Sequence, residues 1–116
     1  MRRIWFKKDC VKWIREGKKT TTFRSLKKEG IYGVVQGSYY RSEFIGLDLV
    51  LTVIKPALEH TVIHEHFSTE GDFRTVDDFK EWLHTNKLVL PQFGYLHDVF
   101  VVPKIPAILA EEEHII

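Results

Sequence analysis

The strongest hydrophobic pattern in the chain is the stretch 47–55, Leu-Asp-Leu-Val-Leu-Thr-Val-Ile-Lys, which is rich in β-branched residues. This composition predicts a β-strand, and Pro56, which has no N–H to donate, is expected to end it. Shorter apolar stretches predict further strands. These cover residues 4–6, 19–24, 31–36 and 95–102.

Three other stretches carry apolar residues at helical spacing. The first runs from Asp9, its expected N-cap, to Glu16, and Gly17 is expected to follow its C-terminal end. The second ends before Gly71, and the third opens at Thr75. The apolar faces comprise Cys10, Trp13 and Ile14 in the first, Val62, Ile63, His66 and Phe67 in the second, and Val76, Phe79, Trp82 and Leu83 in the third.

Strands outnumber helices in this pattern, and the connections between strands have hairpin length. The sequence therefore predicts an α+β fold, a small β-barrel of mixed, mostly antiparallel strands with peripheral helices. At 116 residues, without repeats or linkers, we expect a single domain over residues 1–116. No apolar run approaches membrane-spanning length and no signal-peptide core is present, so we expect a cytoplasmic protein with no membrane partner.

The charge of the chain narrows the possible partners. A formal net charge of +1 argues against a strongly basic nucleic-acid-binding protein that is held mainly by counterion release. Cations are nevertheless concentrated in the first 28 residues, where Asp9 and Glu16 are the only acids. Any contact with nucleic acid must therefore come from a local patch. Cys10, the only cysteine, fits a reducing interior and is expected to be a small apolar helix residue rather than a reactive thiol.

The stretch 16–24, Glu-Gly-Lys-Lys-Thr-Thr-Thr-Phe-Arg, is the most informative candidate for chemistry. It lies where the first predicted helix passes into a strand, and it surrounds three adjacent hydroxyls with two lysines and an arginine. Such a cluster suits an anionic or hydrogen-bond-rich ligand better than it suits a core.

A helix that ends in Gly-Lys-Lys-Thr-x-Thr-x-Arg resembles the signature of the ASCH domain, a compact β-barrel related to the PUA fold. The segment from Gly33 to Ser38 resembles the Gly-x-Gly-Ser-like turn of that family. The segment Glu70-Gly71-Asp72-Phe73 resembles its Glu-Gly-Phe step, with Asp72 as one additional residue. The resemblance extends from about Trp5 to about Val102, and it implies a PUA-like barrel associated with RNA.

One bacterial branch of the family resembles this chain more closely, because it carries Thr where other members carry Glu inside the motif. That branch hydrolyses the amide of N4-acetylcytidine, and its catalytic residues fall on Lys19, Thr22 and Glu70 here. The resemblance implies RNA or a modified nucleoside as partner, with such an amidohydrolase as the alternative function. A nuclease has family precedent, but no convincing general-base histidine supports it. The expected cleft is lined by Lys18, Lys19, Thr20, Thr22, Arg24 and Glu70.

For amide hydrolysis, Thr22 would be the nucleophile, Lys19 the base and Glu70 a proton shuttle, while Lys18 and Arg24 would bind an oxyanion. In a regular strand, however, Lys19 and Thr22 point to opposite faces. They converge only if the chain around Lys19 is still turning, or if the strand carries a bulge. The open alternative is that Lys19 is a solvated lysine and the threonines only favour a strand.

Two further groups of side chains suit a ligand. Tyr39, Tyr40 and Arg41 place aromatic rings beside a cation, which favours stacking on a base, although packing at the rim of the core is the alternative. His60 and His64 are four residues apart and would share a helix face. They lack a third ligand and the His-Glu-x-x-His pattern, so we expect no metal and no cofactor.

Overall fold

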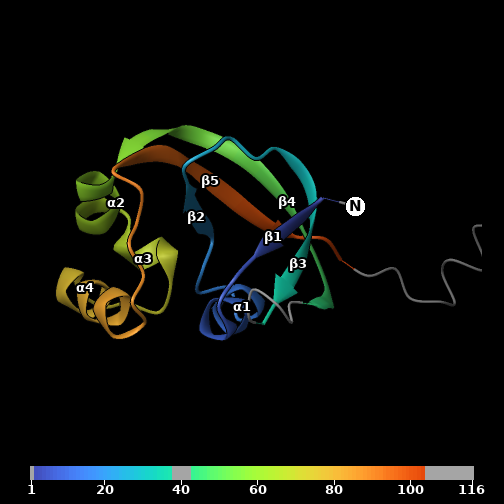
Figure 1. Ribbon diagram of the computed structural model, residues 1–116, viewed down its shortest axis with the longest axis horizontal. Helices are drawn as coiled ribbons and strands as arrows, with labels where there is room; N and C mark the ends of the chain where they lie inside the picture. Colours follow the sequence, from blue (N-terminus) through green and yellow to red (C-terminus); the bar gives the residue numbers. More distant parts are fainter. Residues whose placement is uncertain (1, 38–42, 104–116) are drawn as a thin grey trace, which may run out of the picture.

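The computed structural model describes residues 2–37 and 43–103. In these ranges a curved five-stranded sheet forms half of a barrel, and four helices pack around it (Figure 1). The predicted α+β class is confirmed at this level. The strands are β1 (Arg3–Trp5), β2 (Thr21–Arg24), β3 (Gly30–Gln36), β4 (Glu43–Leu58) and β5 (Phe93–Val101), and the helices are α1 (Lys8–Arg15), α2 (Glu59–Glu65), α3 (Phe67–Glu70) and α4 (Val76–Thr85).

The strand order across the sheet is β1-β3-β4-β5-β2. The pairs β3–β4, β4–β5 and β5–β2 are antiparallel, and β1 runs parallel to β3, so the sheet is mixed and mostly antiparallel as predicted. The strands β1 and β2 are the two edges of this sheet. The Arg24 guanidinium spans between these edges, because its Nη2 donates to the carbonyl oxygen of Trp5 at 2.9 Å.

The end of β4 contradicts the prediction that Pro56 terminates this strand. The strand continues to Leu58 and pairs with β5 throughout this part. The register with β3 ends at Leu51, so within residues 2–37 and 43–103 the following segment of β4 has no second neighbour. The register with β5 shifts between Val53 and Lys55. A missing N–H is tolerated on a strand that is paired on one side only.

The helix boundaries follow the predicted signals with two corrections. Gly17 follows α1 with φ of 75°, and α4 begins directly after Thr75, as expected. Asp9 is not the N-cap of α1, because the helix starts earlier and Lys7 occupies that position. The Asp9 carboxylate instead accepts a hydrogen bond from Trp82 Nε1 at 3.2 Å and so joins α1 to α4. The second predicted helix is interrupted at His66 and forms α2 and α3.

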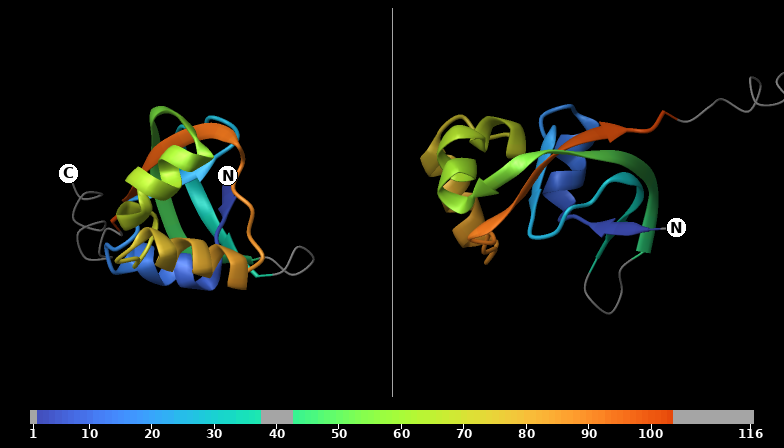
Figure 2. Two further views of the ribbon diagram at one scale, coloured as in Figure 1. Left: turned by 90° about the vertical axis from the view of Figure 1, so that its left-hand side faces the viewer. Right: turned by 90° about the horizontal axis from the view of Figure 1, so that it is seen from above.

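Two hydrophobic clusters make up the core, and both include side chains of the sheet. One cluster contains the buried face of α1, and the other lies between the sheet and α2 and α4. Trp13 and Trp82 pack against both clusters, with their ring centroids 5.4 Å apart. The helices α1 and α4 therefore lie side by side (Figure 2). No helix within residues 2–37 and 43–103 is long and apolar enough to cross a membrane.

Candidate functional site

The segment that follows α1 is still turning when it reaches Lys19. The backbone N–H groups of Lys18 and Lys19 both donate to the carbonyl oxygen of Trp13, at 2.8 and 3.1 Å, and β2 begins only at Thr21. Lys19 is therefore not part of the strand alternation that would separate it from Thr22. The condition for their convergence is met, and both side chains line one cleft.

This cleft has a volume of about 510 Å³ and opens between the start of α1, β2, α3 and α4. One part of its wall is polar and the other part is apolar. The polar part consists of Lys7, Lys19, Thr22, Arg24, Ser25 and Glu70. The apolar part includes Phe6, Phe79, Trp82, Leu83 and the segment from Leu88 to Pro91. A ligand that fits this cleft has both an apolar surface and several hydrogen-bonding groups.

A buried ion pair lies on the polar wall. Lys19 and Glu70 are only 6% and 5% exposed, and Lys19 Nζ lies 3.6 Å from Glu70 Oε2. The same Nζ donates to the Glu70 carbonyl oxygen at 3.0 Å, and Thr21 Oγ1 donates to Glu70 Oε2 at 2.6 Å. Both charges therefore have partners, which a charge in this environment requires.

Gly71, the residue after Glu70, allows the close packing that fixes the position of Glu70. A Cβ added at Gly71 would lie 2.6 Å from Phe73 Cε2 and 2.8 Å from Trp13 Cε3, so the two rings pack directly on the backbone. The Glu-Gly step thus brings α3 against Trp13, whose carbonyl also accepts from Lys19. One tryptophan of α1 therefore positions both members of the ion pair.

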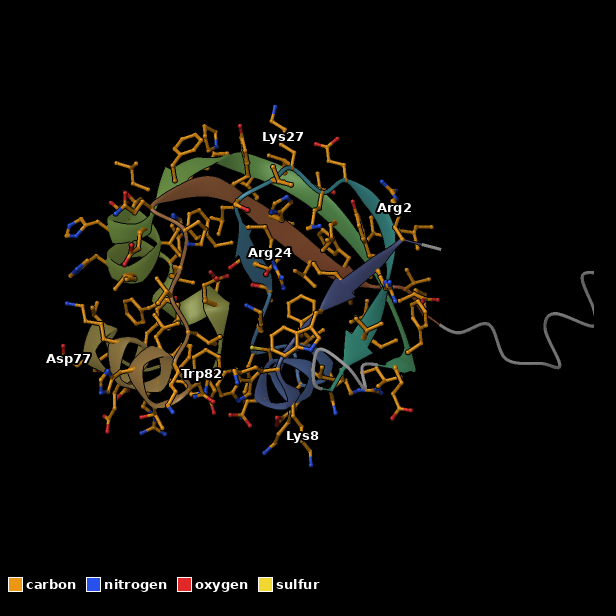
Figure 3. All side chains as sticks on the ribbon, in the orientation of Figure 1. Arg2, Lys8, Arg24, Lys27, Asp77 and Trp82 are labelled. Atoms are coloured by element: carbon orange, nitrogen blue, oxygen red, sulfur yellow. The ribbon has the colours of Figure 1, made fainter. Side chains whose placement is uncertain are left out.

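Arg24 is another cation of the polar wall, and it is hydrogen-bonded to Thr22. Arg24 Nε donates to Thr22 Oγ1 at 3.1 Å, and the guanidinium carbon lies 4.7 Å from the centre of the Phe6 ring. Figure 3 shows this side chain extending from β2 toward β1, while Trp82 lies between α4 and α1. Burial lowers the pKa of Arg24, and the nearby Glu70 carboxylate opposes that shift. The arginine remains a cation at neutral pH, in contact with the threonine hydroxyl.

Five of the predicted residues lie elsewhere or outside the described part of the chain. Lys18 is exposed and pairs with Asp72 Oδ2 at 3.2 Å, and this hydrogen bond and the Asp72 charge raise the pKa of Lys18. Thr20 is exposed, and neither Lys18 nor Thr20 lines the cleft. The residues predicted to stack on a base lie outside the described ranges. They are Tyr39, Tyr40 and Arg41.

His97 is one of two polar residues of this region that sequence reasoning missed, the other being Ser25 of the cleft wall. His97 is fully buried on β5 and is the register partner of Thr22 on β2. Its Nε2 accepts a hydrogen bond from the backbone N–H of Lys28 at 2.9 Å, and its Nδ1 lies 3.3 Å from the Thr22 carbonyl oxygen. The available signal was its place within a strand predicted to be largely apolar.

The cysteine and the exposed histidines give no second candidate for chemistry. Burial raises the pKa of the Cys10 thiol, and the residue lies in the core cluster of α1, as predicted for a small apolar role. His60 and His64 lie together, with ring centroids 4.2 Å apart, and both are exposed. Among the described residues, no group of three or more His, Cys, Asp or Glu side chains is arranged to hold a metal ion.

Models of protein families, characterised proteins and solved structures contain no match to this chain. The resemblance to the ASCH domain therefore stays a prediction.

Proposed function

We propose that this chain is an ASCH-type domain with a PUA-like barrel and that its cleft binds a modified nucleoside. The observation that carries the proposal is the buried Lys19–Glu70 pair, which lies beside Thr22 and Arg24 on a cleft of about 510 Å³. That volume falls within the range that holds ligands of this size. The apolar part of the wall includes Trp82, whose ring offers apolar surface to a base.

The distribution of cations favours a nucleoside over polymeric RNA. A binder of polymeric RNA needs a broad basic groove that connects Arg2 and Arg3 to the cleft. Lys7 does line the cleft, but Arg2 and Arg3 do not. Arg2 instead donates to the Tyr32 hydroxyl at 3.4 Å, with its guanidinium 4.6 Å from the centre of that ring.

The polar wall matches the edge of a nucleobase. Thr22 supplies a hydroxyl that can donate or accept, Arg24 supplies N–H donors, and Glu70 supplies acceptors. A pyrimidine with a modified exocyclic amine presents the complementary set. An acyl group on that amine would face the apolar part of the wall.

The binding test uses Thr22→Val, which removes the hydroxyl while keeping the side-chain shape. We expect isothermal titration calorimetry with N4-acetylcytidine to give a saturable curve for the natural protein. Thr22→Val should bind about ten-fold more weakly, since one buried hydrogen bond contributes about 1–2 kcal/mol. Thr52→Val, at an exposed position of β4, is the matched control and should bind as the natural protein does. Binding of an oligoribonucleotide without binding of the nucleoside would overturn the proposal.

A second candidate function is hydrolysis of the N4-acyl amide, and the bond from Arg24 to Thr22 favours it. A hydroxyl beside a guanidinium loses its proton more easily, because the cation stabilises the alkoxide. If the Lys19 ammonium passes a proton to Glu70, the neutral amine can take the Thr22 proton. Thr22 Oγ1 then attacks the acyl carbonyl, and Lys19 returns the proton to the departing amine of cytidine. Water hydrolyses the resulting ester and releases the carboxylic acid.

The hydrolase is tested by the products that it predicts. We expect N4-acetylcytidine to yield cytidine and acetate in equal amounts, and chromatography measures both products. Thr22→Val should reduce the rate by at least about 10³-fold, because the nucleophile is lost. Bound but unchanged N4-acetylcytidine would eliminate the hydrolase and leave the binding function.

A further inference from the structure

His97 lies between two segments that both contribute to the cleft. An amide N–H can only donate, so the Lys28 bond requires His97 Nε2 to be the unprotonated ring nitrogen. The ring proton is then on Nδ1, directed at the Thr22 carbonyl oxygen 3.3 Å away. Both bonds are satisfied together only by the neutral imidazole.

The Lys28 bond ties the segment between β2 and β3 to the centre of β5. This segment, residues 25–29, has no helix or strand structure and carries Ser25 into the cleft wall. Its cations lie over tyrosine rings of the sheet, Lys27 over Tyr95 at 5.3 Å and Lys28 over Tyr32 at 5.6 Å. Beside these two contacts, the Lys28 bond to His97 is the hydrogen bond that fixes the backbone of the segment to β5.

We propose that His97 is the positioning residue of the cleft, holding Thr22 and residues 25–29 in place while its imidazole is neutral. The effect on ligand binding rests on the proposed nucleoside site, whereas the effect on the segment does not. A proton on Nε2 would place an N–H against the N–H of Lys28, and this bond would be lost. Acid therefore releases residues 25–29 from β5.

The surroundings of His97 disfavour that added proton. Arg24 faces it from β2 and Lys28 from the covering segment, and both are cations, while β4 presents the uncharged Val53 in register. Burial lowers the pKa of His97 most strongly, the two cations act in the same direction, and hydrogen bonds with the backbone of Thr22 and Tyr95 oppose them. The imidazole is consequently neutral at pH 7.

Because the pKa of His97 is lower in the folded protein, the sign of the pH dependence of stability is fixed. The unfolded chain binds a proton at His97 near pH 6.5, and the folded protein binds it only at lower pH. The contribution of His97 to the free energy of unfolding is therefore complete above that pH. It decreases as the pH falls from there through the folded pKa.

Two substitutions of His97 by amide residues test its hydrogen bonds with Lys28 and Thr22 one at a time. His97→Gln can place an amide oxygen near the position of Nε2, and His97→Asn can place an amide N–H near the position of Nδ1. We would measure the hydrogen-exchange protection factor of the Lys28 amide by NMR from pH 8 down to the lowest pH at which the protein stays folded, with N4-acetylcytidine affinity on the same samples. Thermal unfolding confirms that each variant is folded.

In the natural protein, protection of the Lys28 amide should fall by at least about ten-fold on acidification. His97→Gln should keep protection across the range. His97→Asn should lose it at every pH and bind the nucleoside about ten-fold more weakly. Equal protection in His97→Asn and the natural protein, or pH-independent protection in the natural protein, would overturn the proposal. If His97→Asn does not fold, the comparison of the natural protein with His97→Gln still decides. Absence of nucleoside binding in all samples would count against the proposed function alone.

Discussion

Glu70→Leu is expected to lower the free energy of unfolding by about 3–5 kcal/mol, because it leaves a buried ammonium without its carboxylate. Lys19 is 6% exposed, so little water reaches its ammonium in place of the lost partner at 3.6 Å. Thr21 also loses the acceptor of its 2.6 Å hydrogen bond. The change in the free energy of unfolding is measured by urea denaturation with tryptophan fluorescence as the signal, since Trp13 packs against Gly71, the residue after Glu70.

Two controls separate the charge from the change in volume. The double variant Lys19→Met/Glu70→Leu should recover most of the lost stability, because it removes both charges and keeps apolar volume. Asp72→Leu removes the nearer of two carboxylate partners of Lys18, which lies at 3.2 Å but is exposed to water. It should have little effect, since solvent screens that pair. Equal losses in the single and double variants would show that packing, not the ion pair, dominates.

Arg24→Met is expected to weaken N4-acetylcytidine binding by at least about ten-fold, because it removes the cation bonded to Thr22. It also removes the bond to the Trp5 carbonyl that spans the edges of the sheet, which should lower stability by about 2 kcal/mol. Calorimetric titration and thermal unfolding measure the two effects separately.

Arg24→Lys tests whether charge alone is enough. A lysine keeps the positive charge but cannot donate from the planar fork to Thr22 and Trp5 together. We therefore expect Arg24→Lys to bind nearly as weakly as Arg24→Met. Arg74→Met, at an exposed position, is the matched control and should leave affinity unchanged. Natural affinity in Arg24→Met would show that the guanidinium is not part of the ligand site.

Local signals predicted the elements whose ends depend on local chemistry. Thr75 accepts a hydrogen bond from the Asp78 N–H and begins α4, and Gly17 adopts the positive φ that follows α1. The end of β4 was predicted wrongly because it depends on a nonlocal fact. Pro56 is tolerated because the pairing of β4 with β3 ends at Leu51. The sequence of β4 alone does not contain that information.

The residues of the candidate site also differ in whether the local sequence predicts them. Lys19 and Thr22 belong to one short segment, and Gly17 signalled the turn that lets them converge. Glu70 is distant in sequence and was identified through the resemblance rather than from spacing. His97 could not be predicted, because its partners are the Lys28 N–H and the Thr22 carbonyl of two other segments. These contacts arise only when residues 25–29 fold over β5.

The most direct measurement is a titration of the ¹⁵N-labelled protein with N4-acetylcytidine, followed by backbone amide chemical shifts. We predict saturable changes at Lys19, Thr22 and Arg24 on the polar wall, and none at the distant sheet residues Ile31 and Val50. Absence of any change, or changes confined to residues away from the cleft, would contradict the account.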